Sequence, residues 1–251
     1  MIPLRDTIPS SRFPVVTLCL IGINALVFFS EIGLTDEALN RFFHTWGIMP
    51  ACLTQGSLPL WTIRRACALY PDAPLNYITL FSSMFIHGGW MHVIGNMWSL
   101  WIFGDNVEDR MGRVGFLLFY ILSGLAAGAL HIVTNPNSIA PTVGASGAIA
   151  GVMGAYLLLF PHATVVTLVP IFFFIQIIEL PAIFFLGFWF LTQLFSGTLS
   201  LAAAGSQQAG GVAWWAHIGG FVVGCLWAVP LRRRSGIVRR RRRYHDDDDW
   251  W

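Results

Sequence analysis

Ser146 follows a Gly-Ala pair and precedes a run of small and apolar residues, a setting in which a hydroxyl could act as a nucleophile. Residues 141–156 read PTVGASGAIAGVMGAY, and this pattern predicts a helix that begins at the serine. The first N–H groups of a helix have no partner within it, so they could hold an oxyanion there. The plainer interpretation is that Ser146 only caps the helix, and that Gly147, Gly151 and Gly154 let a second helix pack closely.

His217 is the candidate general base, and it lies in a different apolar segment. A serine nucleophile needs a base within hydrogen-bond distance and donors for the negative charge that develops on the substrate. His217, Gly220 and Gly224 fall within about 60° of one another at 100° per helical residue. The imidazole therefore stands on a helix face bare enough for close approach, although a glycine-rich packing face with an incidental histidine is the alternative.

Three further polar residues, His87, His92 and Asn96, interrupt the apolar stretch from Ile78 to Phe103. The two glycines that follow His87 predict a helix that starts near Trp90, which leaves His87 in the entry turn. His92 and Asn96 are four residues apart and share a helix face. Polar groups inside a membrane span are costly and indicate function by default, whereas a structural hydrogen bond to another helix is the alternative.

The composition predicts that these segments lie in a membrane. The chain has 251 residues, of which 55% are hydrophobic and 11% charged, and its mean hydropathy is +0.64. That leaves too little polar surface for a soluble globule of this size and predicts an all-α polytopic membrane protein without room for a second domain. We expect an N-terminal arm over 1–12, a charged and disordered tail over 232–251, and six spans between them, at 13–33, 78–103, 115–133, 146–159, 182–195 and 213–231.

The fourth span is short. It has about fourteen residues from Ser146 to Leu159, or roughly 21 Å at 1.5 Å per residue, against a hydrocarbon core of about 30 Å. If its inner end lies near the inner surface, Ser146 begins below the outer surface. Non-helical backbone at that depth is tolerated only where it is buried in protein or lines a water-filled cavity, so we expect a submerged serine in contact with water.

The arginines give the expected topology. All fifteen basic residues are Arg, and twelve fall on the side of the termini against Arg41, Arg64 and Arg65 on the other side. This asymmetry predicts that both termini are cytoplasmic, and it does not indicate a nucleic-acid site. Spans two, four and six then run inward, so His92, Ser146 and His217 lie at similar depth. That agreement favours a pairing of Ser146 with His217.

The connections between the spans give weaker signals. Residues 34–77 are expected to rest on the bilayer surface as an ordered loop, in which Cys52 and Cys67 could pair if that side is oxidising. The charged segment 104–114 is expected to be a solvent turn, with Glu108 and Arg110 tying helices together. We expect 160–181 to be an interfacial connection and 197–212 to be a mobile loop.

Four motifs together resemble the rhomboid family of intramembrane serine proteases, over nearly the whole chain. Gly144-Ala145-Ser146-Gly147 is similar to the family's Gly-x-Ser-Gly, and Ala216-His217 with Gly220 and Gly224 is similar to its Ala-His-x-x-Gly-x-x-x-Gly. His87, His92 and Asn96 resemble its His-x-x-x-x-His-x-x-x-Asn, and residues 108–112 resemble its Glu-x-Arg-x-Gly turn. The first two motifs are those that contain the candidate nucleophile and base.

The resemblance implies a six-helix rhomboid-like bundle with a membrane-associated first loop and a Ser146–His217 dyad without a third acid. His92, Asn96 and the backbone N–H of Ser146 would stabilise the oxyanion, supported by His87. The partners implied are transmembrane protein substrates and lipid, with no metal, cofactor or nucleic acid, in a bacterial plasma membrane. Some members carry an aromatic residue at the position of Ala150, so other groups are expected to orient His217.

Two rival functions remain at this point. A rhomboid-like protein that binds membrane-protein clients without cutting them is the main alternative, and the presence of both Ser146 and His217 argues against it. A small-solute transporter could use buried histidine and asparagine as ligands. The sequence lacks the inverted internal repeat and the paired broken helices expected of such a transporter.

Overall fold

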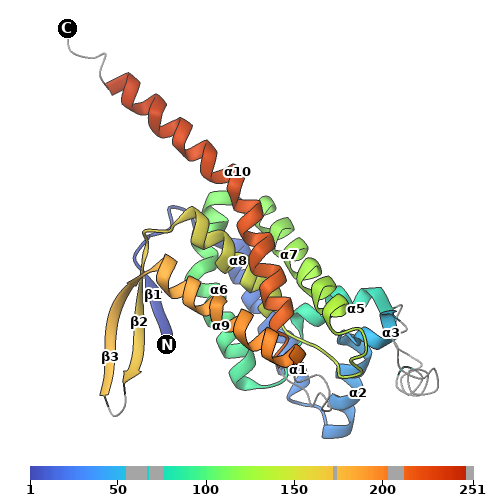
Figure 1. Cartoon of the computed structure of the whole chain (residues 1–251). Coiled ribbons are helices and arrows are strands. Elements are labelled where there is room, and N and C mark those ends of the chain that lie inside the picture. Colours follow the sequence, from blue (N-terminus) through green and yellow to red (C-terminus); the bar gives the residue numbers. More distant parts are fainter. Residues whose placement is uncertain (55–66, 68–75, 172–173, 203–211, 247–251) are drawn as a thin grey trace.

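The computed structural model describes residues 1–54, 67, 76–171, 174–202 and 212–246, and it is mostly helical (Figure 1). The helices and strands, in chain order, are β1 (Ile2–Asp6), α1 (Val15–Glu31), α2 (Asp36–Trp46), α3 (Pro50–Thr54), the 3-10 turn η1 (Asn76–Ile78), α5 (Thr79–Ser82), the 3-10 turn η2 (Ser83–Phe85), α6 (Trp90–Met111), α7 (Arg113–Thr134), α8 (Ser146–Leu159), β2 (Thr164–Ile171), β3 (Phe174–Pro181), α9 (Ala182–Ala202) and α10 (Trp214–Asp246).

Helix α8 lies at the centre of the bundle and packs against α6, α7, α9 and α10 (Figure 1). Its residues from Gly147 to Tyr156 are all buried. None of them is charged, and most are small. Small side chains let the surrounding helices approach the α8 backbone closely. Helix α8 begins at Ser146 and ends at Leu159, as the sequence predicts.

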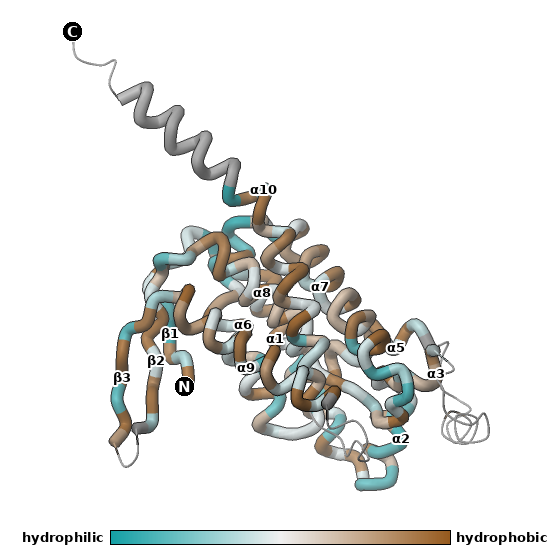
Figure 2. Tube along the Cα trace, viewed as in Figure 1, coloured by the Kyte–Doolittle hydropathy of each residue, from teal (hydrophilic) through white to brown (hydrophobic). Residues whose placement is uncertain are grey.

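The structure is mostly helical, although strands β1, β2 and β3 depart from the all-α prediction. Among the described residues, three helices are long and apolar enough to cross a membrane. They are α7, residues Ala182–Leu201 of α9 and residues Trp214–Arg232 of α10, and their apolar character is visible in Figure 2. The apolar helices α1 and α8 are shorter, with 17 and 14 residues. Helix α6 starts at Trp90, as the two glycines before it predict, and has 22 residues.

The charged segment 104–114, expected as a solvent turn, is instead mostly helical. Helix α6 continues to Met111, and the chain turns only at Gly112, whose φ of 75° suits glycine. The helix continues because Glu108 has a partner. Its carboxylate accepts hydrogen bonds from the backbone N–H groups of Val16 (3.0 Å) and Thr17 (2.8 Å) and so caps the first turn of α1. Glu108 therefore ties two helices together, as predicted. Arg110 does so as well, since it donates a hydrogen bond to the Leu231 carbonyl of α10 at 3.2 Å.

The segment 160–181, expected as an interfacial connection, contains two antiparallel strands that the sequence analysis did not predict. Strand β2 pairs with β3 from Thr164↔Pro181 to Ile171↔Phe174. The N-terminal arm adds β1 on the other side of β2, from Ile2↔Leu168 to Asp6↔Val165, to give an antiparallel sheet in the order β1-β2-β3 (Figure 1). The β-branched run from Val165 to Val169 favours this strand over a loop.

The last two helices are longer than expected. Helix α9 extends to Ala202, where we expected a mobile loop from residue 197, and α10 continues to Asp246, where we expected a disordered tail from residue 232. The rest of that loop, at 203–211, and the end of the tail, at 247–251, lie outside the described residues. In the first loop the expected pair of Cys52 and Cys67 forms a disulfide. Arg64 and Arg65 lie outside the described residues.

Asp6 docks the sheet on the bundle. Its carboxylate accepts hydrogen bonds from the Tyr156 hydroxyl at 2.6 Å and from the Asn106 amide at 2.9 Å. Burial raises the pKa of Asp6 to about 6, against an ordinary 3.8, although the Tyr156 hydrogen bond opposes the shift. The folded state therefore binds the proton more tightly than the unfolded chain does.

We predict that Asp6 makes the protein lose stability as the pH rises from about 4 to about 6, because deprotonation is harder in the folded state. Thermal unfolding in detergent from pH 4 to pH 8 measures the effect. The Asp6→Asn variant should show a shallower fall in this range, and an unchanged fall would show that Asp6 does not contribute.

Candidate active site

Ser146 is the first residue of α8, and its side chain is not used as a helix cap. The N-cap residue is Ala145, and no side chain caps this helix. The Ser146 Oγ instead lies 2.8 Å from Nε2 of His217 on α10. The structure thus replaces the capping interpretation with a serine–histidine pair whose members are 71 residues apart in the chain.

The two helices meet through glycines, as the spacing of His217, Gly220 and Gly224 predicts. A Cβ atom built on Gly220 would collide with the carbonyl oxygen of Gly147, and one on Gly224 would collide with that of Gly151. The α8 and α10 backbones therefore touch over this stretch, which no residue with a side chain would permit. This contact begins one turn below His217 and sets the distance between the serine and the imidazole.

Gln193 on α9 fixes the tautomer of His217. Its side-chain oxygen Oε1 lies 2.8 Å from His217 Nδ1, and its amide group donates to the Trp189 carbonyl at 3.3 Å and to Thr192 Oγ1 at 3.1 Å. An amide oxygen only accepts, so Nδ1 carries the hydrogen. Nε2 is then left as the acceptor for the Ser146 hydroxyl, which is the tautomer that a general base requires.

Aromatic rings hold the His217 imidazole in its plane. The Trp189 ring lies 5.9 Å from it, centroid to centroid, at an interplanar angle of 31°, and Trp214 meets it edge-on at 6.4 Å. Ala150 stands at the position where some rhomboid proteins carry an aromatic residue. It is fully buried, and its methyl side chain cannot stack on the imidazole. Residues of α9 and of the start of α10 therefore orient the imidazole. This agrees with the expectation that groups other than residue 150 do so.

His92 lies beside the turn before Ser146. A Cβ atom built on Gly144 would lie 2.7 Å from His92 Nε2, and the φ of 133° at Gly144 also requires glycine. The Gly88 backbone N–H points at His92 Nδ1 at 3.4 Å. If Nδ1 accepts there, Nε2 carries the hydrogen and faces the turn that leads to the serine. His92 can therefore donate a hydrogen bond at this turn.

Asn96 supplies an unused donor on the same face of α6. The residue is 8% exposed, and its side-chain amide nitrogen has no hydrogen-bond partner among the described residues. A buried donor without a hydrogen-bond partner lowers the stability of the fold. Such a donor is expected where a bound ligand accepts the missing hydrogen bond. Both ring nitrogens of His87, which is 1% exposed, are also without a partner.

The backbone of His87 is anchored by Glu31 at the end of α1. The Glu31 carboxylate is 2% exposed and receives the His87 N–H at 3.3 Å from each oxygen. The His87 ring packs edge-on against His92 at 5.1 Å. Through this contact Glu31 and His87 support the position of His92.

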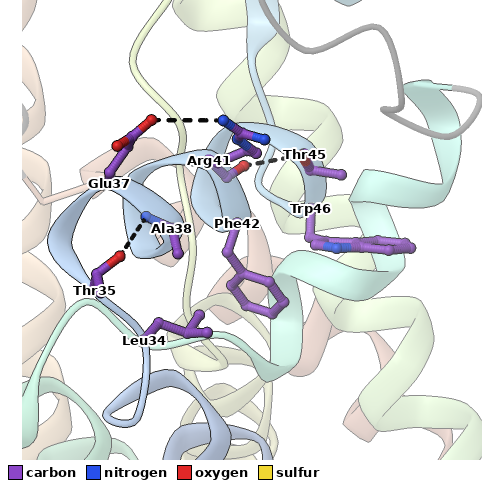
Figure 3. A pocket seen from close by; sticks show the side chains of 8 residues that line it. All are labelled: Leu34, Thr35, Glu37, Ala38, Arg41, Phe42, Thr45 and Trp46. Carbon is purple, nitrogen blue, oxygen red and sulfur yellow. Dashed lines mark hydrogen bonds and ion pairs between the residues drawn. The ribbon is translucent and has the colours of Figure 1, made fainter.

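A pocket of about 460 Å³ lies along α2 and shares no residue with this site. Leu34, Phe42 and Trp46 contribute apolar surface to it (Figure 3). Its charged residues Glu37 and Arg41 form an exposed ion pair at 3.6 Å. The pocket contains no serine, cysteine or histidine and so offers no nucleophile or base of that kind.

Comparison with known proteins identifies the family. The family model named Rhomboid domain matches residues 74–234, which include every residue of the site described above except Glu31. The chain belongs to the rhomboid family. This agrees with the four motifs that resembled the family at the sequence level.

The chain is also similar to several named rhomboid proteins. It is 29% identical to Rhomboid protein 1, mitochondrial, of Saccharomyces cerevisiae over 196 residues, which cover 75% of this chain and 52% of that protein. It is 37% identical over 78 residues to the putative rhomboid protease YdcA of Bacillus subtilis, covering 31% of this chain and 39% of that protein. The chain thus spans about half the length of the first of these relatives.

Sequence reasoning located most of this site and missed two residues. The structure brings Ser146, His217, Gly220 and Gly224 together with Gly144 and Gly147, and places His92 beside them. The residues that the sequence analysis missed are Gln193 and Glu31. Both lie in predicted spans, and neither belongs to a motif. A carboxyl or amide side chain in an apolar run was the available signal in both cases.

We predict that Gly220→Leu abolishes most activity although both members of the dyad remain. The new side chain would push α10 away from the Gly147 carbonyl, and a displacement of about 1 Å can cost roughly 100-fold in rate. Cleavage of a model substrate measures the loss. Leu226→Ile, at a position 66% exposed on the same helix, is the control and should be nearly neutral. Normal activity in a correctly inserted Gly220→Leu protein would contradict the proposed packing.

We predict that Gln193→Leu lowers kcat by roughly 10- to 100-fold, because the imidazole loses its hydrogen-bond partner at Nδ1. Gln193→Glu keeps an acceptor at this position and should retain more activity than the leucine variant. The kcat values and their pH profiles separate this role from a general loss of folding. Equal rates in the leucine variant and the wild type would show that Gln193 does not orient His217.

Proposed function

We propose that this protein is an intramembrane serine protease that cuts transmembrane segments of other membrane proteins. The observation that carries the proposal is the 2.8 Å contact between the Ser146 hydroxyl and the Nε2 atom of His217. Family membership gives independent support. The alternative is a rhomboid-like protein that binds clients without cutting them, and an intact dyad gives no support to that alternative.

The chemistry follows from the geometry of the dyad. The Ser146 oxygen attacks the scissile carbonyl carbon while His217 Nε2 takes the hydroxyl proton, and the carbonyl oxygen becomes an oxyanion. The Ser146 N–H, His92 and Asn96 would donate hydrogen bonds to that oxyanion. The imidazolium then protonates the departing amine as the C–N bond breaks. Water, activated by His217, releases the acyl group and restores the serine.

The membrane arrangement is part of the same proposal. Six crossings, formed by α1 and α6 to α10, would place both termini in the cytoplasm, because arginines gather at the end of the bundle that carries Arg12, Arg110, Arg113 and Arg232. We call this the arginine-rich end. Relatives come from mitochondria, chloroplasts and a bacterium by their names, so a bacterial plasma membrane is one of several membranes that would fit. The loop that contains α2 would rest on the opposite surface.

The test is cleavage of a single-span reporter protein in proteoliposomes. The wild type should cut it, and Ser146→Ala and His217→Ala should not, because each removes one half of the dyad. Asn96→Ala should slow turnover by roughly 10- to 1,000-fold, as the loss of one oxyanion donor does. Residual cleavage near the wild-type rate in folded Ser146→Ala protein would contradict the assignment of the nucleophile.

A further inference from the structure

The β-sheet runs alongside α6 rather than away from the bundle. The Trp98 indole N–H of α6 donates to the Pro3 carbonyl of β1 at 2.6 Å, and the Asn106 amide donates to Asp6 at 2.9 Å. Trp98 and Asn106 are eight positions apart, or about 12 Å along a helix. Strand β1 thus follows the α6 axis, with Asp6 toward the arginine-rich end and Pro3 away from it.

The hairpin of β2 and β3 reaches further along α6 than β1 does. The last pair of the hairpin is Ile171 with Phe174. Ile171 lies six positions after Val165, which pairs with Asp6. At about 3.3 Å per residue the closed end lies roughly 20 Å from the level of Asp6, well into the depth that α6 spans. Figure 1 shows the hairpin extending beside the helices in this way.

The exposed side chains of the sheet match that depth. Near the closed end of the hairpin, Phe174, Ile175 and Ile177 are 73%, 70% and 65% exposed. At the other end of the sheet, Arg5 and Glu179 both lie opposite Val166 and are exposed. An apolar tip and a charged base are what a segment needs to enter the hydrocarbon from the head-group region (Figure 2).

The outer edge of β3 has unsatisfied backbone groups. The sheet order is β1-β2-β3, so in the described part of the chain no strand pairs with the second edge of β3. Open sheet edges are not tolerated in hydrocarbon, where water cannot satisfy the N–H and C=O groups. Gln176, exposed in the apolar half of the strand, adds a side-chain amide with the same need. An added strand would satisfy these groups.

We propose that the open edge of β3 is a docking strand for an extended, apolar segment of the membrane-protein substrate. This inference rests on the proposed protease function. A transmembrane segment that is stretched for cutting exposes its own backbone N–H and C=O groups, so each edge completes the other by strand addition. Strand β3 also leads directly into α9, which carries the Gln193 that orients His217.

A second copy of this chain fits the edge less well, for reasons of symmetry. Two copies with the same orientation in a membrane are related by a twofold axis along the membrane normal, which is close to the strand direction here. A rotation of 180° about that axis leaves the two β3 strands parallel. The side chains of equivalent residues, which lie at the same level, then point to opposite faces of the joined sheet. Neighbouring strands of a regular sheet point such residues to the same face, so this pairing is disfavoured.

Photo-crosslinking in proteoliposomes tests the docking strand. The photoreactive amino acid benzoylphenylalanine replaces Ile177 in the Ser146→Ala background, and a single-span reporter is the bait. The control position is Ile2, which lies in the same cross-strand row through Leu168 but on the opposite edge of the sheet. We expect crosslinks to the reporter from position 177 and not from position 2. Crosslinks to a second copy, to lipid only, or equally from both positions would overturn the proposal.

Kinetics give a second test with a matched control. Ile177→Lys should raise KM for the reporter roughly tenfold with kcat unchanged, since it removes binding and not chemistry. Ile2→Lys places the same charge at the same level on β1 and should leave KM within about twofold. Fluorophosphonate labelling of Ser146 should be normal in both. If Ile177→Lys is labelled normally and its KM is unchanged, the docking proposal is wrong and the protease proposal stands. If the wild type is not labelled, the protease proposal itself is wrong.

Discussion

The contact between the α8 and α10 backbones is the constraint on which the site depends. Ser146 and His217 come from separate helices, and their side chains meet only if α8 and α10 approach each other closely. Gly220 and Gly224 allow this because their α-carbons face the carbonyls of Gly147 and Gly151 without side chains between them. In lipid such close packing is also one of the main sources of helix association, so the interaction that stabilises the bundle also assembles the dyad.

Hydrogen bonds then set the chemistry that this packing permits. The proton on His217 Nδ1 is held by Gln193, a neutral group, so the imidazole is oriented without a buried carboxylate beside it. The buried side-chain amide nitrogen of Asn96 has no hydrogen-bond partner in the part of the chain that the structure describes. Such a group costs stability in the resting protein, and functional sites are where this cost is expected.

The candidate site residues could be predicted from the sequence because the pattern around each of them is local. The start of α8 at Ser146 follows from a glycine turn before a small-residue run, and the shared face of His217 and Gly220 follows from helical periodicity. The sheet was not predicted. Strand β1 lies in an arm whose polar residues hid its pairing, and the prolines at 161, 170 and 181 suggested breaks, although Pro181 ends β3. Strand pairing between residues 160 positions apart carries no local signal. The role of Gln193 depends on how α9 packs, which a single polar residue in an apolar run does not specify.

The most direct measurement is to react the detergent-solubilised protein with a fluorophosphonate and to locate the adduct by mass spectrometry. Such a reagent modifies a serine only when a base removes its proton and donors stabilise the charge that forms. The account predicts one adduct, on Ser146, that disappears when His217 is replaced by alanine. A protein that stays unmodified while folded, or that is modified at another serine, would contradict the claim that these two helices form a working catalytic dyad.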